Sequence, residues 1–183
     1  MCELYIVSRK KPQKERLQMN RPMKLFASFF AGNIVFAFLY AAVCWFVSRL
    51  DITPYGRFMT VFFKGRTPAE AQAYIDANRA LFERMMPEAA QFSNMVITPS
   101  VGLVMGLVIG LIVATRDWTT ALWWSFITVM PVTAIFWFWS TGQDGRARYL
   151  LLLVAVTMAG AFIGNAVSTR ILSGGTAYSS NKK

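Results

Sequence analysis

The segment MVITPSVGLVMGLVIGLIVAT, residues 95–115, carries no charged side chain. A helix of this length, at about 1.5 Å per residue, crosses a hydrocarbon core of roughly 30 Å. Small residues recur in it every four positions, at Gly102, Gly106, Gly110 and Ala114. On a helix this spacing aligns them on one face, which another helix can approach closely but from which lipid chains gain little. The segment therefore predicts a transmembrane helix that packs tightly against a neighbour.

The composition of the whole chain indicates a membrane protein. Of its 183 residues, 55% are hydrophobic and only 15% are charged, whereas a soluble domain carries about a quarter charged residues. There are 19 Lys and Arg against 9 Asp and Glu, a formal net charge of +10. Basic residues flank membrane spans on the cytoplasmic side. We attribute the positive charge to this pattern and expect no nucleic acid as a partner.

Three more apolar runs are long enough to cross a membrane. We expect transmembrane helices over residues 25–47, 95–115, 118–139 and 149–168. The remaining segments are a basic tail at 1–24, a loop at 48–94 and a short polar tail at 169–183. The charged turn at Arg116 and Asp117 is so short that the third span should lie antiparallel beside the second. The predicted fold is an all-α integral membrane protein with four transmembrane helices.

The loop between the first two spans is predicted to contain one amphipathic helix, over residues 67–86. Thr67 has the features of an N-cap, Pro68 suits the first helical position, and Glu70 completes a capping box. Pro87 is expected to break this helix. The apolar run FMTVFF at 58–63 is too short to span and is expected at the interface or beneath the following helix.

One arc of the 67–86 helix is apolar and is predicted to dock on a partner. Its docking residues are Tyr74, Ile75, Leu81, Phe82 and Met85. The opposite face carries charges of both signs, whereas a helix that binds a membrane surface usually has a basic polar face. This favours packing on protein over packing on lipid.

Four spans place both termini on the same side of the membrane. The side with the two tails and Arg116 is strongly basic, and the 48–94 loop is nearly neutral. The positive-inside rule then places both termini in the cytoplasm or an organellar matrix, and the loop with its amphipathic helix outside. The expected location is a bacterial inner membrane or an organellar membrane.

A second small-residue face and two amides lie inside the spans. Gly160 and Gly164 are four residues apart in the fourth span, and Asn33 and Asn165 are the intramembrane amides. Both amides fall in the cytoplasmic half, where they could face each other or a common partner. Helix–helix hydrogen bonds, worth about 0.6–2 kcal/mol, are the simpler interpretation. A polar step in a permeation path is the alternative.

The sequence contains few side chains that could perform catalysis or bind a metal. The chain has no histidine and two cysteines, Cys2 and Cys44. This composition excludes His-ligated haem and His-dependent triads, and two thiols alone are too few for a zinc or iron–sulfur site. We find no nucleophile with a base, no paired carboxylates and no phosphate loop. We therefore expect no catalytic residue, no metal site and no cofactor.

These features favour a non-catalytic structural or assembly subunit of a larger membrane protein complex. Its partners would be the lipid bilayer and other membrane protein subunits, or further copies of the chain. The alternative is a small multi-span transporter or channel, in which Pro99 and Pro131 would mark discontinuous helices. The predicted spans carry no Asp, Glu, Lys or Arg, which counts against ion-coupled transport. A membrane enzyme acting on lipid or isoprenoid is the third hypothesis, and the absence of an acid–base set counts against it.

Overall fold

The computed structural model describes residues 21–115, 117–139 and 145–180. Every regular element in these residues is a helix, and no strand occurs among them. The order is α1 (Arg21–Val47), α2 (Pro54–Phe62), α3 (Pro68–Ala77), α4 (Arg79–Phe92), the π-helical turn η1 (Ser93–Ile97), α5 (Thr98–Val113), α6 (Trp118–Trp139) and α7 (Arg146–Ser180).

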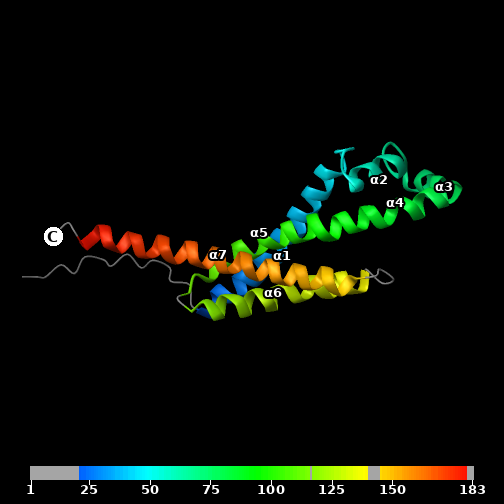
Figure 1. Cartoon of the computed structure of the whole chain (residues 1–183). Coiled ribbons are helices and arrows are strands. Elements are labelled where there is room, and N and C mark those ends of the chain that lie inside the picture. The colour runs from blue at the N-terminus through cyan, green and yellow to red at the C-terminus, as the bar shows by residue number, and fades with distance from the viewer. Residues whose placement is uncertain (1–20, 116, 140–144, 181–183) are drawn as a thin grey trace, which may run out of the picture.

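In the described part of the chain, four helical stretches are long and apolar enough to cross a membrane. They are Pro22–Val47, Arg79–Val113, Trp118–Phe138 and Arg146–Arg170. The chain is thus a multi-pass membrane protein. Figure 1 shows α1, α5, α6 and α7 side by side in an elongated bundle. The start of α1 and the end of α7 lie at one end, and α2, α3 and α4 project as an arm from the other.

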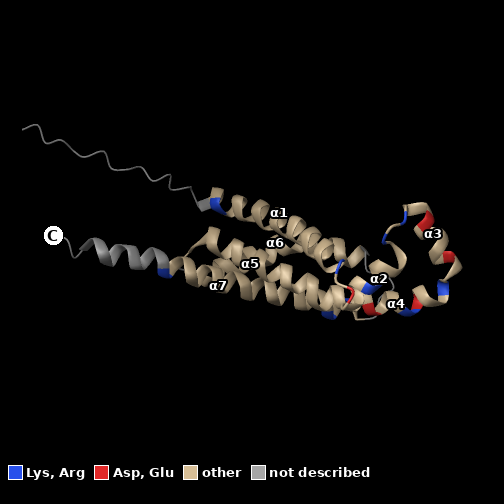
Figure 2. Ribbon diagram, turned by 90° about the horizontal axis from the view of Figure 1, so that it is seen from above, with Lys and Arg blue, Asp and Glu red and all other residues tan. Residues whose placement is uncertain are grey.

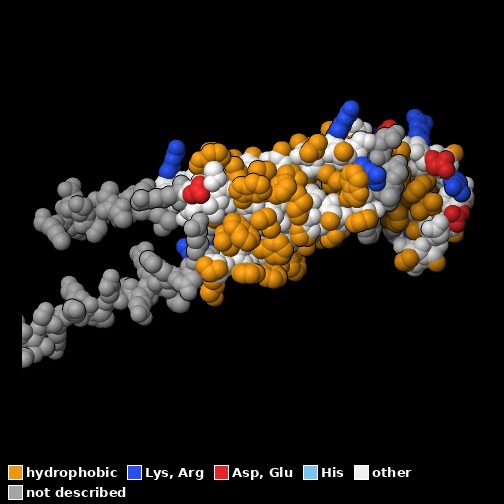
Figure 3. All heavy atoms as spheres, turned by 90° about the horizontal axis from the view of Figure 1, so that it is seen from below, with side chains coloured by type: hydrophobic (Ala, Val, Ile, Leu, Met, Phe, Trp, Pro, Cys, Tyr) orange, Lys and Arg blue, Asp and Glu red, His pale blue; other side chains and the backbone are white. Residues whose placement is uncertain are grey.

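Charge and hydrophobicity follow this division. The four bundle helices carry few charged residues along their length, whereas Lys, Arg, Asp and Glu gather on the arm (Figure 2). Apolar side chains cover the middle of the face shown in Figure 3, and charged side chains lie toward its two ends. This is the surface expected of a bundle whose middle faces lipid and whose ends face water.

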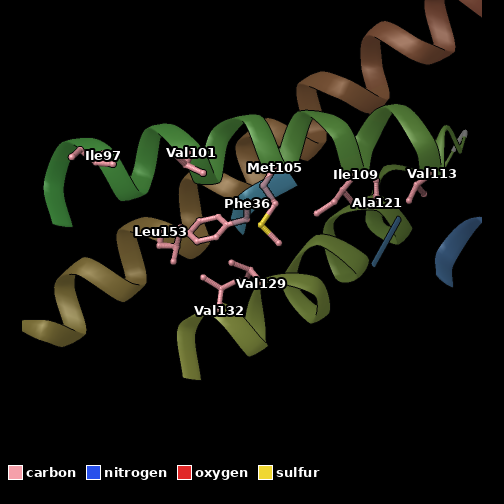
Figure 4. Close-up of a cluster of buried hydrophobic side chains, with 10 residues drawn as sticks. All are labelled: Phe36, Ile97, Val101, Met105, Ile109, Val113, Ala121, Val129, Val132 and Leu153. Atoms are coloured by element: carbon pink, nitrogen blue, oxygen red, sulfur yellow. The ribbon is translucent and has the colours of Figure 1, made fainter. Parts of the chain in front are cut away.

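Helix α5 has two adjacent faces that pack differently. Along one face, residues at four-residue spacing have at most 1% exposure: Ile97 of η1, then Val101, Met105, Ile109 and Val113. They point into the centre of the bundle (Figure 4), where they meet Phe36, Ala121, Val129, Val132 and Leu153. The neighbouring face, one residue further along, carries the glycines and lies against α7. One helix thereby fills the core with large side chains and brings its backbone close to α7.

The helices follow the order α1, α5, α7, α6 around the bundle. The turn after α5 does make α6 antiparallel to it, as expected from its length. However, α5 packs chiefly on α7 and α1, and α6 packs chiefly on α7. The third span is therefore antiparallel to the second and in contact with it, as predicted, but α7 and not α6 is the main neighbour of α5. Glycines on both α5 and α7 allow a closer approach than α6 can make.

The arm differs from the predicted single helix. Residues 67–86 are divided between α3 and α4, with Asn78 as the junction. The capping box at its start is present, because the Thr67 side chain accepts from the Glu70 N–H and the Glu70 carboxylate accepts from the Thr67 N–H. The predicted break at Pro87 is wrong, since α4 continues through it to Phe92. Pro87 has no N–H, so the carbonyl of Glu83 loses its helical hydrogen bond. Because Glu83 is exposed, water can bind this carbonyl instead.

Helix α4 of the arm, η1 and α5 form one continuous helical stretch of 35 residues. Between α4 and α5 the backbone makes a π turn, in which the Thr98 N–H donates to the carbonyl of Ser93. Pro99, which has no N–H to donate, follows directly. A wide turn next to a proline accommodates the missing donor without ending the helix.

Helix α7 is longer than the predicted fourth span. It begins at Arg146 and ends at Ser180, whereas the sequence predicted 149–168 followed by a tail without regular structure. Most of the expected 169–183 tail is therefore helical; residues 181–183 lie outside the described residues. The first span also begins earlier than expected, at Arg21, with Pro22 in its first turn where a proline is tolerated. The predicted 1–24 tail lies outside the described residues up to residue 20.

Candidate functional site

The contact between α5 and α7 is the closest in the bundle. A Cβ atom at Gly106 or Gly110 would collide with the backbone carbonyl oxygen of Thr157 or Ala161 respectively. At Gly102, an added Cβ would lie 2.6 Å from Cδ1 of Leu153, the end of a flexible side chain. The backbones of the two helices are therefore in direct contact at Gly106 and Gly110, which only glycine permits.

The small residues of α7 complete the same contact from the other side. A Cβ atom at Gly160 or Gly164 would collide with the carbonyl oxygen of Leu103 or Leu107 on α5. The two small-residue faces predicted from the sequence thus meet each other, and we call this contact the glycine seam. Ala114, the fourth small residue of the predicted face, lies beyond the helix, because α5 ends at Val113 and Ala114 is its C-cap with a left-handed φ of 41°.

Asn165 closes the glycine seam at the end of α5. It is 5% exposed. Its Oδ1 accepts from the Thr115 N–H at 2.9 Å and its Nδ2 donates to the Thr115 carbonyl at 3.0 Å. A backbone N–H and a backbone C=O just beyond the helix end are therefore satisfied by one side chain. This role is structural and needs no ligand.

Asn33 makes a different contact. Its Nδ2 donates to the carbonyl of Phe29 at 2.9 Å, within α1, and at 3.3 Å to the carbonyl of Thr128 on α6. Next to it, an added Cβ on Gly32 would lie 3.0 Å from Ile109 of α5. The two intramembrane amides thus bond to different segments. The idea that they face each other is wrong, because each is bound to a backbone group of its own neighbouring helix or turn.

The π turn is surrounded by uncharged polar side chains that the sequence analysis did not single out. Tyr40 of α1 shares a hydrogen bond with Ser93, oxygen to oxygen, at 3.3 Å. Tyr55 of α2 lies beside Cys44 of α1, and its pKa is raised above the usual value, first by burial and then by the neighbouring thiol. We call Tyr40, Cys44, Tyr55, Ser93 and Thr98 the π-turn cluster. It joins α1, α2 and α5 where the arm leaves the bundle.

One member of the π-turn cluster makes no well-formed hydrogen bond. Thr98 is 4% exposed, and its Oγ1 makes no hydrogen bond of good geometry to any described residue, although the Tyr40 hydroxyl lies close by. Thr98 lies at a narrow cavity that is also lined by Asn94, Phe136, Arg146, Tyr149, Leu150 and Leu153. A buried hydroxyl without a partner is uncommon in a folded protein. Three polar residues just before Pro99, namely Ser93, Asn94 and Thr98, are the sequence signal that could have drawn attention to it.

Two of the five predicted docking residues of the arm, Tyr74 and Phe82, pack against α2 of the same chain. Phe82 lies 5.3 Å from Phe62 and 5.5 Å from Phe58, between ring centroids, and both partners belong to α2. Tyr74 also contacts Phe62, at 5.9 Å. Of the two expectations for the 58–63 segment, packing beneath the following helix is therefore the one observed. Ile75 and Met85 are partly buried, and Leu81 is 39% exposed.

Within the described residues, no group of three or more Cys, Asp and Glu side chains could hold a metal ion. The π-turn cluster contains hydroxyls, phenols and a thiol, all uncharged at neutral pH. Such a cluster can order a junction between helices. It supplies neither a carboxylate nor a cation for acid–base chemistry.

Comparisons with other proteins add no further assignment. No family model matches the sequence, and no characterised protein or solved structure is significantly similar to it. The function must therefore be argued from the chain itself.

Proposed function

We propose that this chain is a non-catalytic structural or assembly subunit of a larger membrane protein complex. The observation that carries the proposal is the connection between the bundle and the arm. Because α4, η1 and α5 form one helical stretch, the arm has a defined direction relative to the spans. Within the arm, aromatic contacts between α2 and α4 hold these two helices together. A fixed extension of this kind suits a subunit that positions another protein at the membrane surface.

We propose that a partner contacts the outer face of α1 within the membrane. Four large apolar residues at four-residue spacing are more than half exposed: Phe26 66%, Phe30 60%, Ile34 54% and Phe38 76%. Only 11% of the apolar window of α1 is buried, against 56% for the stretch that contains α5. The glycine seam is occupied internally, so a neighbouring subunit or a second copy would have to use such an outer face.

The alternative, a transporter or channel, has less support from the geometry. Hydroxyls inside the spans donate to carbonyls of their own helices, as in Ser28 to Leu25, Ser125 to Leu122 and Thr157 to Leu153. The centre of the bundle is filled by apolar side chains. A permeation path would instead present polar groups toward water or solute.

The orientation is part of the proposal. The positive-inside rule places the end with the two termini in the cytoplasm or matrix, and therefore the arm on the outer side. There the charged faces of α3 and α4 would meet water, and their apolar side would stay against α2. A cysteine-accessibility experiment on the arm, from each side of the membrane, tests this assignment.

Site-specific photo-crosslinking tests the proposed function. A benzophenone amino acid is placed at Phe38 on the outer face of α1, or at Leu81 on the arm. The matched control is Phe36, which is on the same helix as Phe38 but is 5% exposed in the core. We expect the first two positions to form adducts with a different membrane protein and the control to form none.

Purification in mild detergent supplies the second measurement. A stoichiometric membrane protein that co-purifies and matches the crosslinked adduct supports the proposal. A chain that purifies alone, or only with further copies of itself, contradicts the subunit role. Solute flux through liposomes that contain the purified chain would favour the transporter alternative.

A further inference from the structure

A groove lies where the end of α1 meets α2. It has a volume of about 530 Å³ and is lined by Trp45, Ser48, Arg49, Met59, Phe63 and Lys64. The lining thus combines two cations and a hydroxyl with three large apolar side chains. None of these residues belongs to the glycine seam or the π-turn cluster.

The groove is located at the boundary of the membrane. Helix α1 ends at Val47, and Arg49 follows two residues later. Trp45, in the last turn, is 60% exposed, and exposed tryptophans near helix ends mark the headgroup level of a bilayer. The guanidinium of Arg49 lies over the Trp45 ring, 4.0 Å from its centroid. The apolar part of the groove can therefore reach lipid chains while its cations reach headgroups.

The two cations of the groove are not neutralised by the protein. In the part of the chain that the structure describes, no carboxylate lies within 4.0 Å of Arg49 or Lys64. Asp51, the nearest acid in sequence to Arg49, instead accepts a hydrogen bond from Thr60 at 2.5 Å. Two unpaired cations beside apolar side chains fit an anionic group that carries a hydrocarbon chain.

The hydroxyl of Ser48 further restricts which lipid headgroup fits the groove. Ser48 donates its proton to the carbonyl of Trp45 at 2.7 Å. Its oxygen therefore remains an acceptor toward the groove. An acceptor in the same groove as two cations suits a headgroup that bears a hydroxyl next to its phosphate, and it offers nothing to a choline group, which has no donor.

We propose that this groove binds an anionic phospholipid with a hydroxylated headgroup, of the phosphatidylglycerol type. Arg49 and Lys64 contact the phosphate, and Ser48 accepts from a headgroup hydroxyl. An acyl chain lies along Trp45, Met59 and Phe63. This site is independent of the proposed subunit role, because it needs only the end of α1 and α2.

Native mass spectrometry of the full chain in neutral detergent tests the site. The purified protein is titrated with phosphatidylglycerol and, separately, with phosphatidylcholine, and the first bound lipid is quantified. We expect a preference for phosphatidylglycerol of about thirtyfold, from the attraction of two basic side chains for an anionic headgroup. The double variant Arg49→Gln with Lys64→Gln should lose this preference.

Arg57 provides the matched control. It is an exposed cation of α2 that does not line the groove, so Arg57→Gln should keep the preference. Lys64→Gln alone should lose part of it without disturbing the Arg49–Trp45 contact, and a thermal melt shows that each variant is folded. Equal losses in the Arg57 variant, or equal binding of both lipids to the unchanged protein, overturn the proposal. Complete displacement of the lipid by millimolar glycerol phosphate also overturns it, in favour of a site for a soluble phosphate.

Discussion

The carboxamide of Asn165 in α7 makes hydrogen bonds to both backbone groups of Thr115, 50 residues earlier in the chain. The turn after α5 is thereby fixed to the helix that α5 packs against. Without this side chain, a backbone donor and an acceptor at the end of α5 would lose their partners. An unsatisfied buried polar group costs about 1–3 kcal/mol.

The first prediction concerns this pair of hydrogen bonds. Asn165→Leu should lower the free energy of unfolding by about 1–2 kcal/mol, measured by titration with a denaturing detergent. Asn33→Leu is the matched variant, since it removes the other intramembrane amide. Its effect should be below about 1 kcal/mol, because one of its bonds stays within α1 and the other is long, at 3.3 Å. Equal effects of the two variants would contradict this account.

The second prediction separates backbone contact from side-chain contact in the glycine seam. Gly106→Ala forces a methyl group against the carbonyl of Thr157, which cannot move without shifting α7. Gly102→Ala meets the end of the Leu153 side chain, which can rotate away. We expect Gly106→Ala to destabilise the protein by about 1–3 kcal/mol or more, and Gly102→Ala by clearly less. Thermal unfolding in the same detergent gives the comparison, and the reverse order would rule out a direct backbone contact.

The third prediction concerns the buried hydroxyl of Thr98. Because its Oγ1 makes no hydrogen bond of good geometry to the described residues, Thr98→Val should leave stability unchanged or raise it by up to about 1 kcal/mol. Thr157→Val is the control. There the hydroxyl donates to Leu153 at 2.8 Å and lies close to Gly102, so the change should destabilise. A loss of stability in the Thr98 variant would mean that the hydroxyl does have a partner.

The fourth prediction concerns pH and the start of α3. The hydrogen bonds from the backbone N–H and the hydroxyl of Thr67 hold the pKa of Glu70 below its ordinary value of 4.5. A lowered folded-state pKa stabilises the fold above the ordinary value, and this contribution is lost as the pH falls through the lowered pKa. Hydrogen exchange of the α3 amides measures it. The difference in protection between the unchanged protein and Glu70→Gln should be present at neutral pH and disappear in acid.

The membrane location follows from features that a local stretch of sequence contains. An uncharged run of adequate length makes a span wherever it lies, so the four spans were predictable within a few residues at most ends. The capping box at Thr67 and Glu70 was predictable for the same reason, because its partners are three residues apart. The errors at Pro87 and at the end of α7 arose where propensity alone suggested a break and the helix continued.

The candidate sites depended more strongly on distant contacts. The apolar arc that contains Tyr74 and Phe82 was predicted to dock on a partner. These two residues pack on α2 of the same chain, which the sequence could not distinguish from an outside partner. The π-turn cluster was missed because its members come from α1, α2, η1 and α5. Within each helix they are single polar residues that form no motif.

The amino-acid sequence alone determined that this chain spans a membrane and that two of its helices have small-residue faces. Hydrophobicity, length and a four-residue spacing are local properties, and they persist in any arrangement of the helices. Only the tertiary structure decided that these two faces meet each other, that Asn165 binds Thr115 and that α7 rather than α6 is the main neighbour of α5. A spacing defines the shape of a helix surface. Which surface it meets depends on two parallel helices, α5 and α7, having their glycines at the same depth, and that depends on all four helices together.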